Sequence, residues 1–214
     1  NGRILVGEGA SQMKYQLKKG KNIWYSFKME LGEDLGAKYY DSELREVDPF
    51  RIKNPVDAAR VFFAYLKYLI IKYCTENNIS TDILYAVSIP ASFEANQRKD
   101  LLDALMANDM KVSKQALIDE PNAAFISYAV SRAAEDRPMF ISPDYNSKVL
   151  VFDFGGGTCD ISILEIGQSA NGFFSKNIAI SKFTKLGGDD IDRYITYHYL
   201  MPRFLEANGK KKEQ

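Results

Sequence analysis

The spacing of apolar residues along the chain predicts several helices, one of them long. Between Asn54 and Asn77, apolar side chains recur every three or four residues, with Asn54 as the N-cap and Pro55 at the first helical position. The expected apolar stripe consists of Val56, Ala59, Phe63, Leu66, Ile70 and Tyr73. Shorter helices or helical turns are expected over residues 7–18, 22–31, 94–108, 119–135 and 189–206. Ser92 is the expected cap of the helix over residues 94–108.

Runs of β-branched and apolar residues predict the strands. The expected strands cover residues 83–89, 115–118, 148–154, 158–166 and 173–183. The three glycines at 155–157 form the turn of a hairpin between two of them. Residues 32–52 are expected to form irregular strands, and residues 136–147 a surface loop. Strands that alternate with helices in this way predict an α/β fold.

Composition restricts the functional classes further. The 214 residues carry 28 basic and 28 acidic side chains, whereas binding to a nucleic-acid backbone requires a basic surplus. The longest apolar stretch, residues 61–73, is interrupted by two lysines and is shorter than the roughly 20 residues of a membrane-spanning helix. Cys74 and Cys159 are far apart and the chain has one histidine, which argues against a disulfide framework or a zinc site. We expect a soluble, cytoplasmic chain without nucleic-acid or membrane partners.

The sharpest chemical signal is Asp-Phe-Gly-Gly-Gly-Thr-Cys-Asp at residues 153–160. Three consecutive glycines are costly unless another group approaches the backbone closely. The amides of such a turn form a concavity for anions, to which Thr158 adds a hydroxyl group. Asp153 and Asp160 fit beside a phosphate if Mg²⁺ and its waters lie between. An ordinary glycine hairpin with solvated acids is the alternative interpretation.

Two weaker signals accompany this turn. Leu-Gly-Gly-Asp-Asp-Ile-Asp at residues 186–192 places Gly187 and Gly188 where a helix begins, a position that favours phosphate. A plain strand-to-helix turn explains the same segment. In Ile-Asp-Glu-Pro at residues 118–121, Glu120 either starts a helix or holds an attacking or metal-bound water.

Four segments together resemble the nucleotide-binding domain of the seventy-kilodalton heat-shock (DnaK-like) chaperones. They are Ser-Ile-Pro-Ala-Ser-Phe…Gln-Arg from residue 88, Ile-Asp-Glu-Pro-Asn-Ala-Ala from 118, Phe-Asp-Phe-Gly-Gly-Gly-Thr-Cys-Asp from 152 and Leu-Gly-Gly-Asp-Asp-Ile-Asp from 186. The family patterns read Val-Pro-Ala-Tyr-Phe…Gln-Arg, Asn-Glu-Pro-Thr-Ala-Ala, Asp-Leu-Gly-Gly-Gly-Thr-Phe-Asp and Leu-Gly-Gly-Glu-Asp-Phe-Asp. The resemblance covers nearly the whole chain and is weaker before residue 54.

This resemblance implies the actin-like ATPase fold, in which two lobes with ribonuclease-H-like sheets enclose ATP or ADP with Mg²⁺. Residues 1–118 would then form part of the first lobe, namely the outer subdomain and part of the inner one. Residues 119–214 would form the interlobe connection helix and the start of the second lobe. The fold would be incomplete, because the family's first phosphate loop and adenosine-binding segment have no counterpart in this sequence.

The resemblance also implies roles for individual residues. The second phosphate loop would consist of Gly155, Gly156, Gly157 and Thr158. Gly187 and Gly188 would lie near the phosphates, Asp153 would hold waters around Mg²⁺, and Asp160 would sit near a monovalent cation. Glu120 would help to position the attacking water. Lys28, in a segment that matches the family's Lys-Arg-Leu-Ile-Gly, would approach the γ-phosphate. Its alternative is an exposed helical lysine.

The resemblance also implies a signalling role for two residues. Pro90 and Arg98 match a pair that, in the family, relays the nucleotide state toward the peptide-binding domain.

The sequence departs from the family patterns at four positions inside the motifs. They are Ser92, Asn122, Cys159 and Ile191, none of which removes a phosphate donor. We expect an ATP-dependent folding chaperone that meets clients and co-chaperones through other regions, while residues 1–214 alone bind ATP weakly and lack activity. The alternatives are an actin-like filament protein, a sugar kinase or a non-hydrolysing scaffold.

Overall fold

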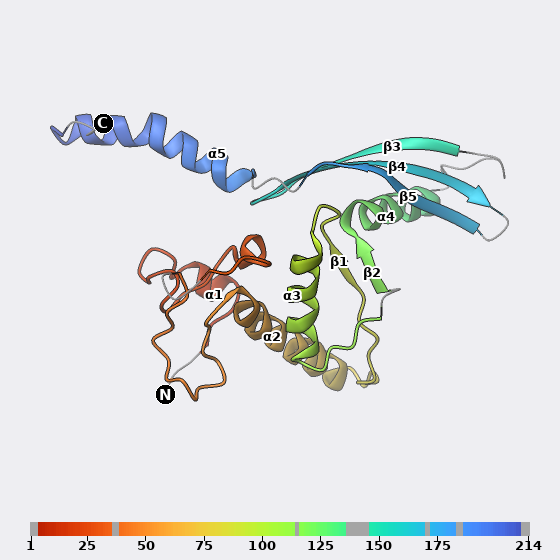
Figure 1. Cartoon of the computed structure of the whole chain (residues 1–214), viewed down its shortest axis with the longest axis horizontal. Coiled ribbons are helices and arrows are strands. Elements are labelled where there is room, and N and C mark those ends of the chain that lie inside the picture. The colour runs from red at the N-terminus through yellow and green to blue at the C-terminus, as the bar shows by residue number, and fades with distance from the viewer. Residues whose placement is uncertain are drawn as a thin grey trace. The chain divides into compact units, whose positions relative to one another are not determined.

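A computed structural model describes residues 4–35, 39–113, 116–135, 146–169, 172–182 and 186–210 of the chain. Contacts divide the chain into two compact units. The first unit comprises residues 1–89 and 93–118, and the second comprises residues 90–92 and 119–214. Figure 1 shows the elements of both units along the chain, which confirm a mixed α/β fold. The assignment of the units to two lobes stays a prediction.

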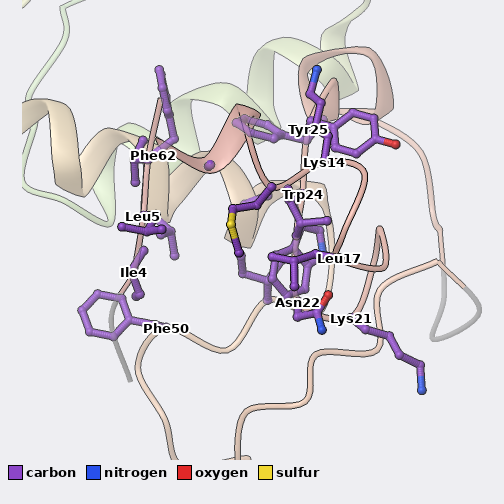
Figure 2. Close-up of a pocket in the computed structure, with 18 of the residues that line it drawn as sticks. Ile4, Leu5, Lys14, Leu17, Lys21, Asn22, Trp24, Tyr25, Phe50 and Phe62 are labelled. Atoms are coloured by element: carbon purple, nitrogen blue, oxygen red, sulfur yellow. The ribbon is translucent and has the colours of Figure 1, made fainter. Parts of the chain in front are cut away.

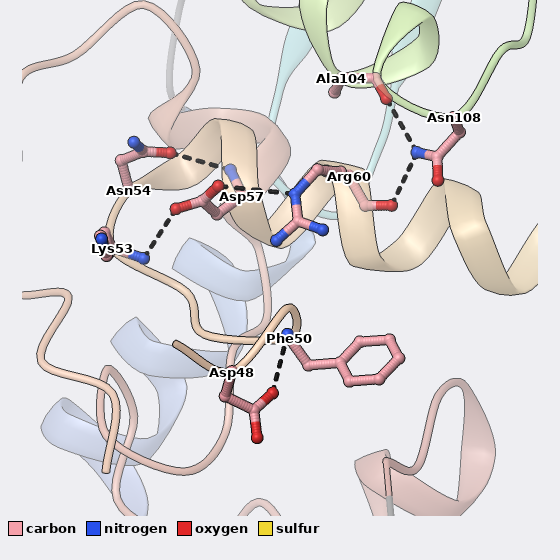
Figure 3. Close-up of polar contacts among 8 residues, drawn as sticks. All are labelled: Asp48, Phe50, Lys53, Asn54, Asp57, Arg60, Ala104 and Asn108. Atoms are coloured by element: carbon pink, nitrogen blue, oxygen red, sulfur yellow. Dashed lines mark hydrogen bonds and ion pairs between the residues drawn. The ribbon is translucent and has the colours of Figure 1, made fainter. Parts of the chain in front are cut away.

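The first unit is built around two helices, α2 (Pro55–Glu76) and α3 (Ala95–Met106). It also contains the short helix α1 (Glu8–Ser11), the 3₁₀ turn η1 (Phe27–Glu30) and a two-stranded sheet of β1 (Val87–Ile89) and β2 (Leu117–Asp119). The predicted start of α2 is confirmed, because the Asn54 side chain accepts a hydrogen bond of 2.8 Å from the amide of Asp57 (Figure 3).

The two helices are joined by polar contacts around Asn108, just after the end of α3. Its side-chain amide donates to the carbonyl oxygens of Arg60 and Ala104, both at 2.9 Å (Figure 3). Lys67 of α2 in turn donates to the carbonyl oxygen of Asn108 at 2.6 Å. The bonds to the Ala104 and Asn108 carbonyls satisfy groups that helix geometry leaves open at the end of α3, and the contacts with Arg60 and Lys67 fix α3 against α2.

The core of the first unit differs from the predicted stripe on α2. Ala59 is buried and Phe63 is half-buried, but Tyr73 is 61% exposed. The buried cluster consists of Tyr40, Ile52, Ala58 and Val61, with Trp24, Phe27 and Leu35 packed against it. Residues before α2 therefore cover a face of the helix next to the predicted stripe. The buried α2 residues of this cluster are Ala58 and Val61.

Several predicted elements of the first unit are wrong or shorter than expected. The helix expected over residues 7–18 ends at Ser11 and continues as turns. Among the described residues of the range 32–52 there is no strand. Only the end of the strand predicted over 83–89 forms, as β1. Ser92 does not cap α3. Glu94 occupies that position, and its amide donates to the side chain of Gln97 at 2.9 Å.

The second unit packs helix α4 (Glu120–Ala134) against an antiparallel sheet of three strands in the order β3-β4-β5 (Figure 1). These strands are β3 (Asn146–Phe154), β4 (Cys159–Ser169) and β5 (Gly172–Ile180). Their core consists of Phe125, Leu164 and Ile166, with Ala129, Val149 and Val151 packed against it. The predicted hairpin between β3 and β4 is confirmed. Most of the loop predicted over 136–147 lies outside the described residues.

The last helical segment contains an irregularity that the sequence pattern did not predict. Helix α5 (Gly188–Ile195) leads through a π-helical stretch, η3 (Thr196–Leu200), into α6 (Met201–Ala207). Pro202 stands at the start of α6 and has no amide hydrogen for the preceding turn. A widened turn before it relieves this mismatch. No helix in the described part of the chain has the length and apolarity that crossing a membrane requires.

Candidate functional site

The glycine segment forms the tight end of the β3–β4 hairpin. Phe154 pairs with Cys159, and the amide of Gly155 donates to the carbonyl oxygen of Thr158 at 2.9 Å. This bond closes the turn and leaves Gly156 and Gly157 at its tip. Within the described residues, neither of these two amides donates to a backbone carbonyl. Gly156 is exposed and Gly157 is half-buried, so the amide of Gly156 is the donor at the surface of the tip.

The second glycine motif lies directly against this turn. The amide of Gly188 donates to the carbonyl oxygen of Gly155 at 3.0 Å, and the amide of Asp189 donates to that of Gly156 at 2.8 Å. A Cβ atom on Gly187 would lie 2.6 Å from the carbonyl carbon and oxygen of Gly156. Only glycine fits at such a distance from the backbone. The structure thus joins two motifs that are about thirty residues apart.

The amides of this second motif are already used within the chain. Gly188 donates to the first glycine turn, and the amide of Gly187 donates to the side chain of Asp190 at 3.1 Å. Both glycines therefore support the turn at 155–157 and place the start of α5 beside it. Their approach to phosphate stays a prediction.

Two acids flank the glycine turn on neighbouring strands. Asp153 of β3 pairs directly with Asp160 of β4, which is 6% exposed, whereas Asp153 is exposed. The hydroxyl group of Ser92 donates a hydrogen bond to the buried carboxylate of Asp160. This contact explains why Ser92 is not a helix cap, and sequence reasoning missed it because the two residues are far apart along the chain. Like charges in facing positions favour a cation nearby.

The residues present suit a Mg²⁺ ion that retains most of its water. Mg²⁺ is commonly held by one or two carboxylates together with substrate phosphates, rather than by a cage of protein ligands. The exposed Asp153 beside the glycine amides provides such a carboxylate. In the described ranges, no group of three or more histidine, cysteine or acidic residues could form a cage.

The start of α4 is attached to strand β5. The carboxylate of Asp119 accepts a hydrogen bond of 2.7 Å from the Asn177 side chain, and Asn122 donates to the hydroxyl group of Ser175 at 3.1 Å. Glu120 lies between these two attachments and is half-buried. Ser175 and Asn177 were not predicted as contacts. Their alternation along β5 was the available signal, since residues two apart share a face of a strand.

Of the remaining predicted site residues, Lys28 and Arg98 belong to the first unit and Pro90 to the second. Lys28 is exposed on the 3₁₀ turn η1. Pro90 is buried, and the guanidinium Nε of Arg98 donates to the carbonyl oxygen of Phe93 at 2.9 Å. This bond holds the start of α3.

The first unit also contains an apolar cavity of about 610 Å³ between the segments before α2 and the helix itself (Figure 2). Trp24, Phe50 and Phe62 contribute to its walls. The cavity includes none of the predicted site residues. The buried indole nitrogen of Trp24 has no hydrogen-bond partner among the described residues.

Comparison with known proteins now supports the motif assignment. Residues 41–213 match the family described as Hsp70 protein. The chain is 29% identical over 210 residues to the chaperone protein DnaK of Nitrosopumilus maritimus, a match that covers 97% of this chain and 28% of that protein. It is 38% identical over 123 residues to the chaperone protein DnaK 1 of a Synechococcus species, covering 58% of this chain and 14% of the relative.

The chain belongs to the Hsp70 family, because the family match extends over most of its length. The expectation that it is part of the nucleotide-binding domain of a DnaK-like chaperone is confirmed at this level. It spans less than a third of the length of either relative.

Proposed function

We propose that residues 1–214 contribute the second phosphate loop and a catalytic lysine to the ATPase domain of a DnaK-like chaperone with an actin-like, two-lobed fold. The observation that carries this proposal is the packing of Gly187 against Gly156. It is so close that a Cβ atom added to Gly187 would lie 2.6 Å from the carbonyl group of Gly156. This packing fixes the glycine turn, and Gly156 at its tip stays exposed. A turn of this kind binds the phosphates of ATP or ADP.

Each residue around the turn then has a chemical task. The amides of Gly156 and Gly157 and the hydroxyl group of Thr158 bind phosphate oxygens. Asp153 would hold Mg²⁺ through its bound waters, and that ion would supply positive charge beside the phosphates. Asp160, held by Ser92, would contribute a carboxylate oxygen to a monovalent cation.

Two residues outside the turn complete the proposed chemistry. Glu120 positions the attacking water from the start of α4. Lys28 supplies positive charge to the γ-phosphate as negative charge develops there.

The whole protein would use ATP turnover to control the binding of unfolded clients, with co-chaperones acting through other regions. Its two cysteines, Cys74 and Cys159, are free thiols, which suits the cytoplasm.

Membership in the Hsp70 family argues against a filament protein or a sugar kinase. A non-hydrolysing scaffold remains the second candidate, and a full-length protein without measurable ATP turnover would favour it. Where the parent does turn over ATP, unchanged turnover in Lys28→Ala would show that Lys28 has no catalytic task.

Gly156→Ala tests the phosphate loop. A Cβ on Gly156 meets no atom within 4 Å, so the methyl group fits the fold but occupies the proposed phosphate position. We expect the full-length protein to keep its unfolding midpoint and to lose at least about tenfold in MgATP affinity by calorimetry, because backbone amides can no longer approach the ligand. Gly9→Ala, also in open space, is the control. Unchanged affinity in Gly156→Ala would contradict the assignment.

A further inference from the structure

Neighbouring residues hold the 3₁₀ turn η1 in place from several sides. Lys28 is the exposed residue among its four. Phe27 packs edge-on against Phe62 of α2, with ring centroids 6.0 Å apart. Glu30 accepts a hydrogen bond from the hydroxyl group of buried Tyr40 and forms an ion pair of 2.7 Å with Lys19. The turn is therefore anchored at both its first and its last residue.

A second attachment follows directly after the turn, at Gly32. Its amide donates to the carboxylate of Asp100 at 2.8 Å, and its carbonyl oxygen accepts a bond of 2.9 Å from the side chain of Asn96. Both side chains belong to the first half of α3. Two side chains of α3 thus bind both the backbone amide and the backbone carbonyl group of Gly32.

Gly32 fits this position because it has no side chain. Its φ angle is +80°, which non-glycine residues rarely adopt. A Cβ would lie 2.7 Å from the Cγ of Gln97 and 2.8 Å from the Nδ2 of Asn96. Leu31, which precedes it, is 2% exposed. The backbone at this point has little freedom as long as α3 provides both partners.

We propose that Asp100 and Asn96 are positioning residues for Lys28: they hold Gly32 on α3 and thereby fix the turn that presents the lysine. This inference rests on the proposed function, in which Lys28 acts on the γ-phosphate. A hydrogen bond to an ionised carboxylate is stronger than one between neutral groups, so Asp100 contributes the larger share. Small displacements of a charged group relative to the reacting atoms reduce the rate strongly.

The first experiment measures the attachment itself. Asp100→Ala removes the acceptor of the Gly32 amide, and we expect hydrogen exchange at this amide to become at least about tenfold faster through local opening. Asp103→Ala is the matched control, because Asp103 lies on the same helix but pairs with exposed Lys99. Exchange at Gly32 that does not change in Asp100→Ala would overturn the proposal. Asp100→Asn, whose side-chain oxygen still accepts, should restore slow exchange.

The second experiment measures the consequence in the full-length natural protein. Single-turnover ATP hydrolysis should slow about tenfold in Asp100→Ala and less in Asn96→Ala, while the Kd for ATP stays within about twofold. Asp100→Asn should recover most of the rate, and Asp103→Ala should match the parent. Faster exchange at Gly32 together with an unchanged hydrolysis rate would overturn the positioning role.

Failure of the proposed function gives a different result. If Lys28→Ala hydrolyses ATP at the parent rate, Lys28 has no catalytic task, and the positioning role is overturned with it. If Lys28→Ala is inactive but Asp100→Ala and Asn96→Ala hydrolyse normally, the proposed function stands and only the positioning role is overturned. Where Asp100→Ala does not fold, Asn96→Ala provides both measurements: we expect faster exchange at Gly32 and slower single-turnover hydrolysis, and parent-like values of either would overturn the positioning role.

Discussion

Two turns of the molecule are held in opposite ways. One is the glycine turn of the second unit, residues 155–157, and the other is the lysine turn of the first unit, residues 27–32, which carries Lys28. Backbone atoms hold the glycine turn, through the bonds from Gly188 to Gly155 and from Asp189 to Gly156. Side chains hold the lysine turn, through Tyr40 on Glu30 and through Asp100 on Gly32. The first arrangement is sensitive to added atoms, because backbone cannot move aside. The second is sensitive to removed atoms, because each lost side chain loses an attachment.

Gly187→Ala should have the largest effect. Its Cβ would lie 2.6 Å from backbone atoms of Gly156 and Gly157, so the start of α5 must separate from the glycine turn. We expect a loss of about 3 kcal/mol in unfolding free energy, at the upper end for overpacking, together with the loss of MgATP binding. Urea unfolding followed by far-UV circular dichroism measures the first effect, and calorimetry on the full-length protein the second. A stable variant with parent-like affinity would show that the two glycine motifs do not need to touch.

Gly32→Ala applies the same substitution to the side-chain-held turn. The positive φ angle costs about 1–2 kcal/mol for alanine, but the nearest atoms, on Gln97 and Asn96, belong to side chains that can shift. We therefore expect a total loss of about 2 kcal/mol, smaller than at Gly187. Trp24 is the only tryptophan and packs against the core of the first unit, so its fluorescence reports this unfolding. Gly9→Ala is again the control, and a loss larger than at Gly187 would reverse the comparison.

Sequence reasoning succeeded where the signal is local. The Asn54-Pro55 start of α2 and the hairpin at Gly155–Gly157 each depend on a few adjacent residues, and both are confirmed. It failed before α2, where residues 32–52 form no strand in the described part and serve as a cover for the helix. Such a cover has no period of its own, because irregular backbone presents its apolar residues at no fixed spacing.

The contacts that define the candidate site were predicted only in part. The glycine motifs were recognised separately, but nothing in their spacing indicates that Gly187 touches Gly156. The contacts of Ser92 with Asp160 and of Asp100 with Gly32 join residues 68 positions apart. Polar side chains at such separations carry no pairing signal in a single sequence. The fold must place them together before their chemistry can be read.

Tyr40→Phe removes one attachment of the lysine turn and should have a smaller effect. Burial, followed by the hydrogen bond to Glu30, raises the pKa of the Tyr40 hydroxyl group well above its usual value of 10. At neutral pH we expect a loss of about 1 kcal/mol from the missing hydrogen bond. Fluorescence-detected urea unfolding of both proteins provides the measurement.

The pH dependence of this difference follows from the direction of the pKa shift. Below pH 10 the hydroxyl group is protonated in both states, so the contribution of Tyr40 is complete. Above pH 10 the unfolded chain ionises while the folded one does not, and the parent loses up to about 1.4 kcal/mol per pH unit relative to Tyr40→Phe. The difference between the two proteins should close near pH 11. A constant difference up to pH 11 would contradict the raised pKa.

Asn122→Ala should have the smallest effect, although Asn122 holds the start of α4 by a side chain. Its amide nitrogen donates to Ser175, but its buried side-chain oxygen has no partner among the described residues. Alanine removes a hydrogen bond and, at the same time, an unsatisfied buried acceptor, so the two terms offset each other to about 0.5 kcal/mol. Urea unfolding followed by circular dichroism measures this value, with Ser175→Ala as the partner variant. A loss above about 2 kcal/mol would mean that side chains hold the second unit as firmly as they hold the lysine turn, and the contrast between the two regions would fail.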